Sequence, residues 1–192
     1  EAELSQRKAI NLKPDFAIAY SNLGSILSKL GNLKEAELSY RKAIELQPDL
    51  AGTHLNLGNI LRSLGKLKGA EKSYLKAIKL NPNYTMAYLN LGTILKDLGK
   101  LEEAELSTRK AIELKPDFAE AYSNLGSILN DLGKLGEAEF SLLKAIQLQP
   151  ELTENLFTLG DILVESKKYK DALNYYLKSL EIKPWDIKIS WR

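Results

Sequence analysis

Residues 17–50 read AIAYSNLGSILSKLGNLKEAELSYRKAIELQPDL, and a closely similar sequence returns along the chain. The prolines mark the interval: all six stand 34 residues apart, at Pro14, Pro48, Pro82, Pro116, Pro150 and Pro184. Nine of the twelve glycines follow the same interval on two further tracks, Gly24, Gly58, Gly92, Gly126 and Gly160, then Gly31, Gly65, Gly99 and Gly133. A period of this length predicts a stack of similar units rather than one globular core.

Each unit reads as two helices joined by short turns. Apolar residues recur at steps of three and four, which is the spacing of a helical face. In residues 17–50 this spacing connects Tyr20, Leu23, Leu27 and Leu30, then Leu33, Ala36, Tyr40 and Ala43. The Gly31 track follows the first segment, where helices commonly end in a left-handed residue, and each proline follows the second. No alternating pattern typical of strands appears.

This arrangement resembles the tetratricopeptide repeat, which combines aromatic–x2–Leu–Gly–x2–aromatic, Ala–x3–aromatic–x2–Ala and a closing proline. The matching residues in 17–50 are Tyr20, Leu23, Gly24, Leu27, Ala36, Tyr40, Ala43 and Pro48. The resemblance implies an all-α solenoid, a right-handed superhelix of antiparallel helix pairs whose first helices line the concave side. We expect a single array over 1–192: a lone second helix in 1–16, full repeats in 17–50, 51–84, 85–118, 119–152 and 153–186, and a tail or further element in 187–192.

Small residues at Gly24 and Ala36 indicate that the two helices of a repeat approach closely there. The chain departs from the repeat pattern at a few positions, namely Thr108, Leu142, Ser179 and the pair Ser166-Lys167. We expect these departures to loosen packing locally without changing the fold.

Composition excludes several classes of function. The formal net charge of the 192 residues is only +2, which does not favour nucleic acid or an anionic membrane as a partner, and no apolar run is long enough to span a bilayer. The chain has no Cys and a single His, His54, which stands at an aromatic core position. There is also no glycine-rich phosphate loop. We therefore expect no cofactor, no metal and no catalysis within this segment.

The first helices carry rows of residues that the core does not need. One row bears primary amides, which can donate to and accept from the backbone of an extended peptide. It consists of Asn22, Asn56, Asn90 and Asn124, with Asn59 on the neighbouring row. The row resembles the asparagine ladder in the repeat arrays of O-linked N-acetylglucosamine transferases. Asparagine is also common at this position in ordinary repeats, so a consensus role is the alternative.

Two further features of these rows are candidates for recognition. Met86, Leu55, Leu89 and Phe157 could form an apolar pocket, although scattered exposed apolar residues are normal. The lower rows change from basic to acidic along the chain, from Lys29, Arg62 and Lys96 to Asp97, Asp131, Asp161 and Glu165, with Glu120 and Glu154 at the acidic end. This change of charge along the rows would orient a bound peptide with its basic segment toward the C-terminal half of the array. The alternative is that the charged side chains only keep this face solvated.

Two hypotheses of function follow. In the first, the chain is a protein-interaction scaffold that binds an extended peptide or protein segment in the groove of its first helices. In the second, it is the substrate-recruiting or oligomerising arm of a larger enzyme, such as a glycosyltransferase, methyltransferase or sulfotransferase. The expected partner is a protein or peptide. Self-association through the exposed ends of the array is also expected, because the helix in 1–16 lacks its companion.

Overall fold

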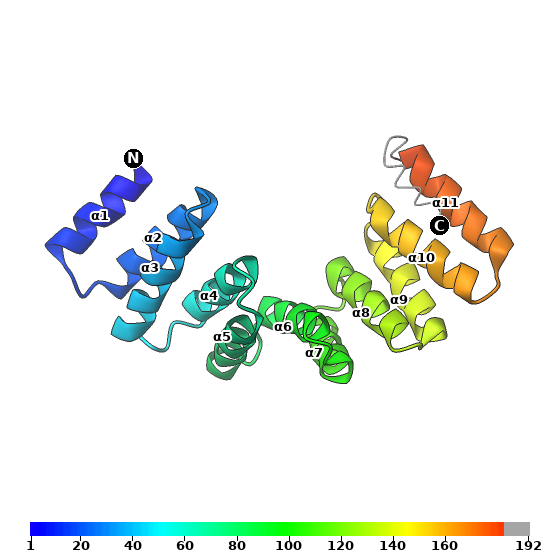
Figure 1. Cartoon of the computed structure of the whole chain (residues 1–192), viewed down its shortest axis with the longest axis horizontal. Helices are drawn as coiled ribbons and strands as arrows, with labels where there is room; N and C mark the ends of the chain where they lie inside the picture. Colours follow the sequence, from blue (N-terminus) through cyan, green and yellow to red (C-terminus); the bar gives the residue numbers. More distant parts are fainter. Residues whose placement is uncertain (183–192) are drawn as a thin grey trace. The chain divides into compact units, whose positions relative to one another are not determined.

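The apolar spacing and turn chemistry of the sequence produce helices throughout. The computed structural model describes residues 1–182, and in this part every regular element is an α-helix (Figure 1). The helices are α1 (Ala2–Leu12), α2 (Ala17–Lys29), α3 (Leu33–Leu46), α4 (Ala51–Ser63), α5 (Leu67–Leu80), α6 (Thr85–Asp97), α7 (Leu101–Leu114), α8 (Ala119–Asp131), α9 (Leu135–Leu148), α10 (Thr153–Glu165) and α11 (Tyr169–Ile182). None of the helices described is both long and apolar enough to cross a bilayer.

The helices form two compact units, one of residues 1–98 and one that begins at Gly99. Within each unit, three-residue connections such as 30–32 make consecutive helices run antiparallel. The pairs α2–α3 and α4–α5 in the first unit, and α8–α9 and α10–α11 in the second, have the largest interfaces. Each second helix also packs on the first helix that follows it, as α3 does on α4. Each unit is thus an all-α solenoid, which confirms the expected fold class.

The boundaries assigned to the repeats stay a prediction. Pro184 and the proposed tail in 187–192 lie outside the described residues.

A left-handed residue ends each first helix. At Gly31, φ is +80°, the Gly31 N–H donates to the Ser28 carbonyl at 3.0 Å and the Asn32 N–H donates to the Leu27 carbonyl at 2.9 Å. These two bonds close the last turn of the helix. Lys167 takes the same role in the last repeat described, with φ of 59°. The departure from glycine therefore leaves the turn in place, in a conformation that disfavours a side chain.

The two helices of a pair meet where a glycine faces a bulky side chain. A Cβ atom added at Gly58 would lie 2.7 Å from Cδ1 of Tyr74, whose side chain is fully buried. At Gly126 the same atom would lie 2.7 Å from Cγ of Leu142. The glycine therefore makes room for a side chain of the second helix, which sharpens the expectation of a close approach between helices.

Two carboxylates, one buried and one half-buried, form ion pairs between successive repeats. Glu37 accepts hydrogen bonds from Lys66 Nζ at 2.7 Å and from Arg41 Nη2 at 3.0 Å, and these donors lower the pKa of its carboxyl group. In the second unit, Glu105 accepts a bond from Lys134 at 2.7 Å and its pKa is lowered in the same way. A lowered carboxyl pKa contributes stability above the unfolded value, and this contribution is lost as the pH falls through the folded value.

Replacement of Gly58 by Ala should destabilise the first unit. Overpacking against the buried Tyr74 ring costs about 1–3 kcal/mol, which outweighs the gain of up to about 1 kcal/mol in helix propensity. Urea denaturation measures the difference. Gly136→Ala is the matched control, because a Cβ atom there meets nothing within 4 Å and only the propensity gain remains. Equal stability changes for the two variants would contradict the close-approach account.

Replacement of Lys167 by Gly should stabilise the second unit. Glycine removes the steric penalty of the left-handed conformation, which is about 1–2 kcal/mol for a residue with a side chain. The midpoint of chemical denaturation should rise. Asn174→Gly, at an exposed position in the middle of α11, should lower the midpoint instead, since glycine weakens a helix interior. A lowered midpoint for Lys167→Gly would refute strain at this turn.

Candidate functional site

The first helices of each unit form a common surface, which we call the first-helix face. In the first unit α2 contacts α4 and α4 contacts α6, and in the second unit α8 contacts α10. By contrast, α3 and α5, the second helices that flank α4, have no Cα atoms within 8 Å of each other. The first helices are therefore closer together than the second helices. Within each unit, the first-helix face lies on the inside of the curve.

The predicted asparagine row lies on this face, but its members differ in surroundings. Asn22 is exposed and Asn56 is half-buried, and neither amide has a hydrogen-bond partner within residues 1–182. Asn124 is half-buried and lines a pocket between α8 and α10. The amides of Asn22 and Asn56 thus retain both donor and acceptor groups for a partner.

Asn59 and Asn90 belong to a network inside the first unit. The Asn59 Oδ1 atom accepts one hydrogen bond from Tyr74 Oη and another from Asn90 Nδ2, each at 2.9 Å. The phenol of Tyr74 reaches the first-helix face from α5, beneath the surface. The network links α4, α5 and α6, which gives these two asparagines a structural role.

The structure corrects part of the predicted apolar pocket. Leu55 and Leu89 are 8% and 1% exposed, so both are core residues rather than residues of an open groove. The repeat pattern predicts exposure at these two positions because they are not among the first-helix positions that it assigns to the core. Met86 is 41% exposed, as expected of a residue that meets a partner. Phe157 is half-buried, with its ring 5.9 Å from that of Tyr176.

The predicted charged residues are mostly accessible. Arg62, Asp97 and Asp131 are exposed, and Lys96 is half-buried. Asp161 is exposed and accepts a hydrogen bond of 2.7 Å from Tyr176 Oη. Burial of the Tyr176 phenol, together with Asp161, raises the pKa of the phenol. Asp161 therefore resembles Asn59, because each accepts a hydrogen bond from a tyrosine hydroxyl of the second helix in its repeat.

A polar pocket of about 490 Å³ opens between α8 and α10. Its lining residues are Glu120, Ser123, Asn124, Ser127, Leu142, Gln149, Leu152, Glu154, Asn155 and Thr158. Asn155 is only 2% exposed, and sequence reasoning missed it. The available signal was a departure from the repeat, because the equivalent positions hold Ala19, Ala87 and Ala121, with Thr53 as the other exception.

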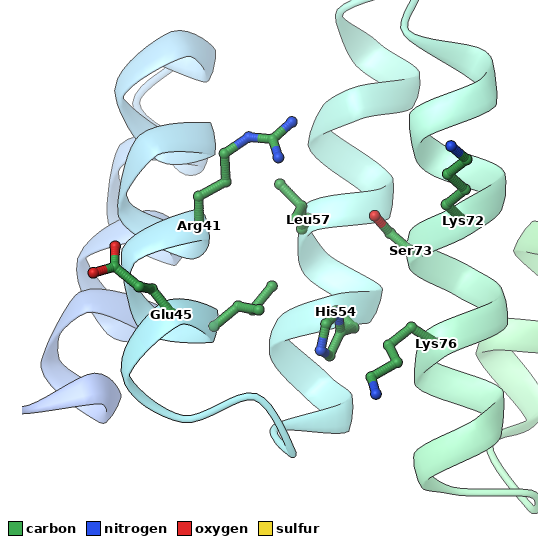
Figure 2. A pocket seen from close by; sticks show the side chains of 8 residues that line it. Arg41, Glu45, His54, Leu57, Lys72, Ser73 and Lys76 are labelled. Atoms are coloured by element: carbon green, nitrogen blue, oxygen red, sulfur yellow. The ribbon is translucent and has the colours of Figure 1, made fainter.

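A second pocket, of about 390 Å³, lies on the other side of the first unit, between α3, α4 and α5 (Figure 2). Arg41, Lys72 and Lys76 surround it, and His54 lies between α3 and α5 in this view. His54 is 7% exposed and its Nε2 atom lies 3.0 Å from the Pro48 carbonyl oxygen, so it is a packed residue as expected.

Most polar groups of this second pocket have local partners. Arg41 donates to Glu37, Glu45 accepts a bond from Lys42, and Ser73 donates to the Gly69 carbonyl. These local hydrogen bonds indicate that the pocket is a packing gap between the neighbouring second helices α3 and α5. Among the described residues, no group of three or more His, Cys, Asp or Glu side chains is arranged to hold a metal ion.

Comparison with known protein families gives a consistent result. The family pattern described as "Tetratricopeptide repeat" matches residues 17–50 and, in a second form, residues 117–184. A pattern described as "TPR repeat" matches residues 58–99 and 92–133. Together these matches cover most of the chain. No curated protein sequence matches the chain.

Several solved structures are similar to this chain. YrrB, described as a TPR protein with an unusual peptide-binding site, is 26% identical with a TM-score of 0.79, over 94% of this chain and 93% of that one. PilF of Pseudomonas aeruginosa is 25% identical with a TM-score of 0.77, over 86% and 75% of the two chains. MamA of Desulfovibrio magneticus RS-1 is 23% identical with a TM-score of 0.83, over 89% and 97%, which shows a shared fold.

Replacement of Tyr74 by Phe should change the response of the first unit to alkali. Burial raises the pKa of Tyr74 to about 12, whereas an unfolded tyrosine titrates near 10. The contribution of the Tyr74 phenol to the free energy of unfolding is therefore fully present below about pH 10. It falls by about 1.4 kcal/mol per pH unit as the pH rises toward 12. Urea denaturation at about pH 9 and pH 11.5 should show a loss that is up to about 2 kcal/mol larger in the native chain than in Tyr74→Phe.

Tyr169 provides the control for this titration. Its side chain is 63% exposed, so Tyr169→Phe should keep the alkaline loss of the native chain. An identical loss in native protein and Tyr74→Phe would show that the buried phenol does not control the alkaline stability.

Proposed function

The chain belongs to the tetratricopeptide repeat family, and from this premise we propose that it binds an extended peptide or protein segment on its first-helix face. Repeat arrays of this family and the solved structures similar to the chain support a role in protein interaction. The observation that carries the proposal is the pair of uncommitted amides, Asn22 and Asn56, on the inner surface of the first unit.

These amides suit the backbone of an extended segment. A primary amide can donate to a peptide carbonyl and accept from a peptide N–H at the same time, whatever side chains the peptide carries. Asn22 and Asn56 stand one repeat apart and retain both groups. This is the arrangement proposed from the resemblance to the asparagine ladder of glycosyltransferase arrays. We propose the same role within the second unit for Asn124, which stands at the equivalent position of its repeat.

Two further observations support a peptide as the partner. YrrB, which is 26% identical to this chain, is described as having an unusual peptide-binding site. Met86 exposes 41% of its surface on α6, the first helix that contacts α4, and offers an apolar contact to a partner. The second hypothesis, the arm of a larger enzyme, and self-association through the ends of the array stay predictions.

The proposal can be tested with a phage-displayed library of random dodecapeptides selected on the native chain. Peptides enriched on the native chain should bind the triple variant Asn22→Ala, Asn56→Ala, Asn124→Ala at least about tenfold more weakly, because each lost hydrogen bond contributes about 0.5–1.5 kcal/mol. Fluorescence anisotropy with labelled peptides gives the dissociation constants, and circular dichroism confirms that the variant is folded.

The control removes three exposed amides from second helices. Asn11, Gln147 and Asn174 lie on α1, α9 and α11, and their side chains are exposed. The variant Asn11→Ala, Gln147→Ala, Asn174→Ala should bind the peptides as the native chain does. Equal losses in the two variants, or no enrichment of any peptide, would refute binding on the first-helix face.

A further inference from the structure

The pocket between α8 and α10 contains a buried amide that the fold does not satisfy. Asn155 is 2% exposed and lies on α10, on the side that meets α8. Its Oδ1 atom accepts a hydrogen bond from Ser123 Oγ, but its Nδ2 atom is buried and has no hydrogen-bond partner. An unsatisfied buried donor is costly, and native structures contain few of them.

The first unit makes the same contact with two hydroxyl groups and without an amide nitrogen. There, Ser21 Oγ and Thr53 Oγ1 lie 2.9 Å apart, at the positions equivalent to Ser123 and Asn155. One hydroxyl donates and the other accepts, so each oxygen atom has a hydrogen-bond partner. Threonine at position 155 would therefore complete the helix contact. The asparagine adds an N–H donor that the contact between helices does not use.

The surroundings of this donor are acidic. Glu120 and Glu154 line the same pocket, stand at equivalent positions of consecutive repeats and are both exposed. In the first unit this row holds Ile18, Gly52 and Met86 instead. The change to carboxylates gives the pocket a negative charge, and no basic residue is part of its lining. A pocket of this kind favours a cationic side chain.

We propose that this pocket is a subsite for a lysine or arginine residue of an extended peptide. The cationic group lies between Glu120 and Glu154, and the backbone carbonyl of the peptide accepts the hydrogen bond that Asn155 Nδ2 offers. Asn124 and Thr158, from the asparagine row and its continuation, line the pocket beside this donor. The inference rests on the proposed function. It adds which type of peptide residue is recognised and which pocket recognises it.

The experiment uses a positional library of amidated, acetylated hexapeptides on the native chain, with one central position fixed to each amino acid in turn. Pools with lysine or arginine should bind at least about tenfold more tightly than pools with glutamate or alanine. Glu120→Gln combined with Glu154→Gln should remove this preference. Glu102→Gln combined with Glu103→Gln, two exposed positions on α7 outside the pocket lining, is the matched control and should keep it.

Asn155→Thr separates recognition from packing. This variant restores the hydroxyl pair seen at Ser21 and Thr53, so the fold should remain at least as stable, while affinity for the lysine and arginine pools should fall about fivefold to tenfold. Unchanged affinity would show that Asn155 serves packing or holds a water molecule only, and would overturn its role. Peptide binding without any basic preference would overturn the subsite but not the proposed function. No binding of any pool would overturn the proposed function itself.

Discussion

The close approach of the two helices in a pair is the constraint on which the other features depend. At Gly58 there is no room for a β-carbon, because the ring of Tyr74 fills the space. This contact sets the distance between α4 and α5, and it also brings the buried phenol of Tyr74 to a position beneath the first-helix face. There the Tyr74 hydroxyl donates a hydrogen bond to Asn59, which also accepts one from Asn90 on the next first helix. A packing requirement of the core thereby organises polar groups on the face proposed to bind.

Contacts between neighbouring first helices are matched in polarity. Ser21 meets Thr53 in the first unit, and Ser123 meets Asn155 in the second. Between these two polar pairs in the sequence, the equivalent pair of positions holds the apolar residues Leu55 and Ala87. The residues that align two repeats thus lie beside the residues that are proposed to meet a partner. A change in recognition on this face must therefore preserve the neighbouring contact.

The sequence predicts the fold well because proline or glycine marks all but one of the turns at a fixed interval, and because the apolar spacing is helical throughout. The binding face is predicted less well. The repeat pattern predicts Leu55 and Leu89 to be exposed, because it does not assign their positions to the core, although these leucines are buried. Asn155 is not predicted as a site residue for the opposite reason, since its position holds a small core residue in most of the repeats. In both cases the deciding factor is the neighbouring helix, which a single repeat does not contain.

Lys167 shows that a turn of this family persists after its glycine has been replaced. The backbone keeps φ of 59°, and the Lys168 N–H still donates to the Leu163 carbonyl at 2.8 Å. The helices on both sides of the turn, and not the residue in it, therefore decide its geometry. Glycine at this position is therefore favoured but dispensable. A count of repeats that relies on the glycine alone would end this array one repeat too early.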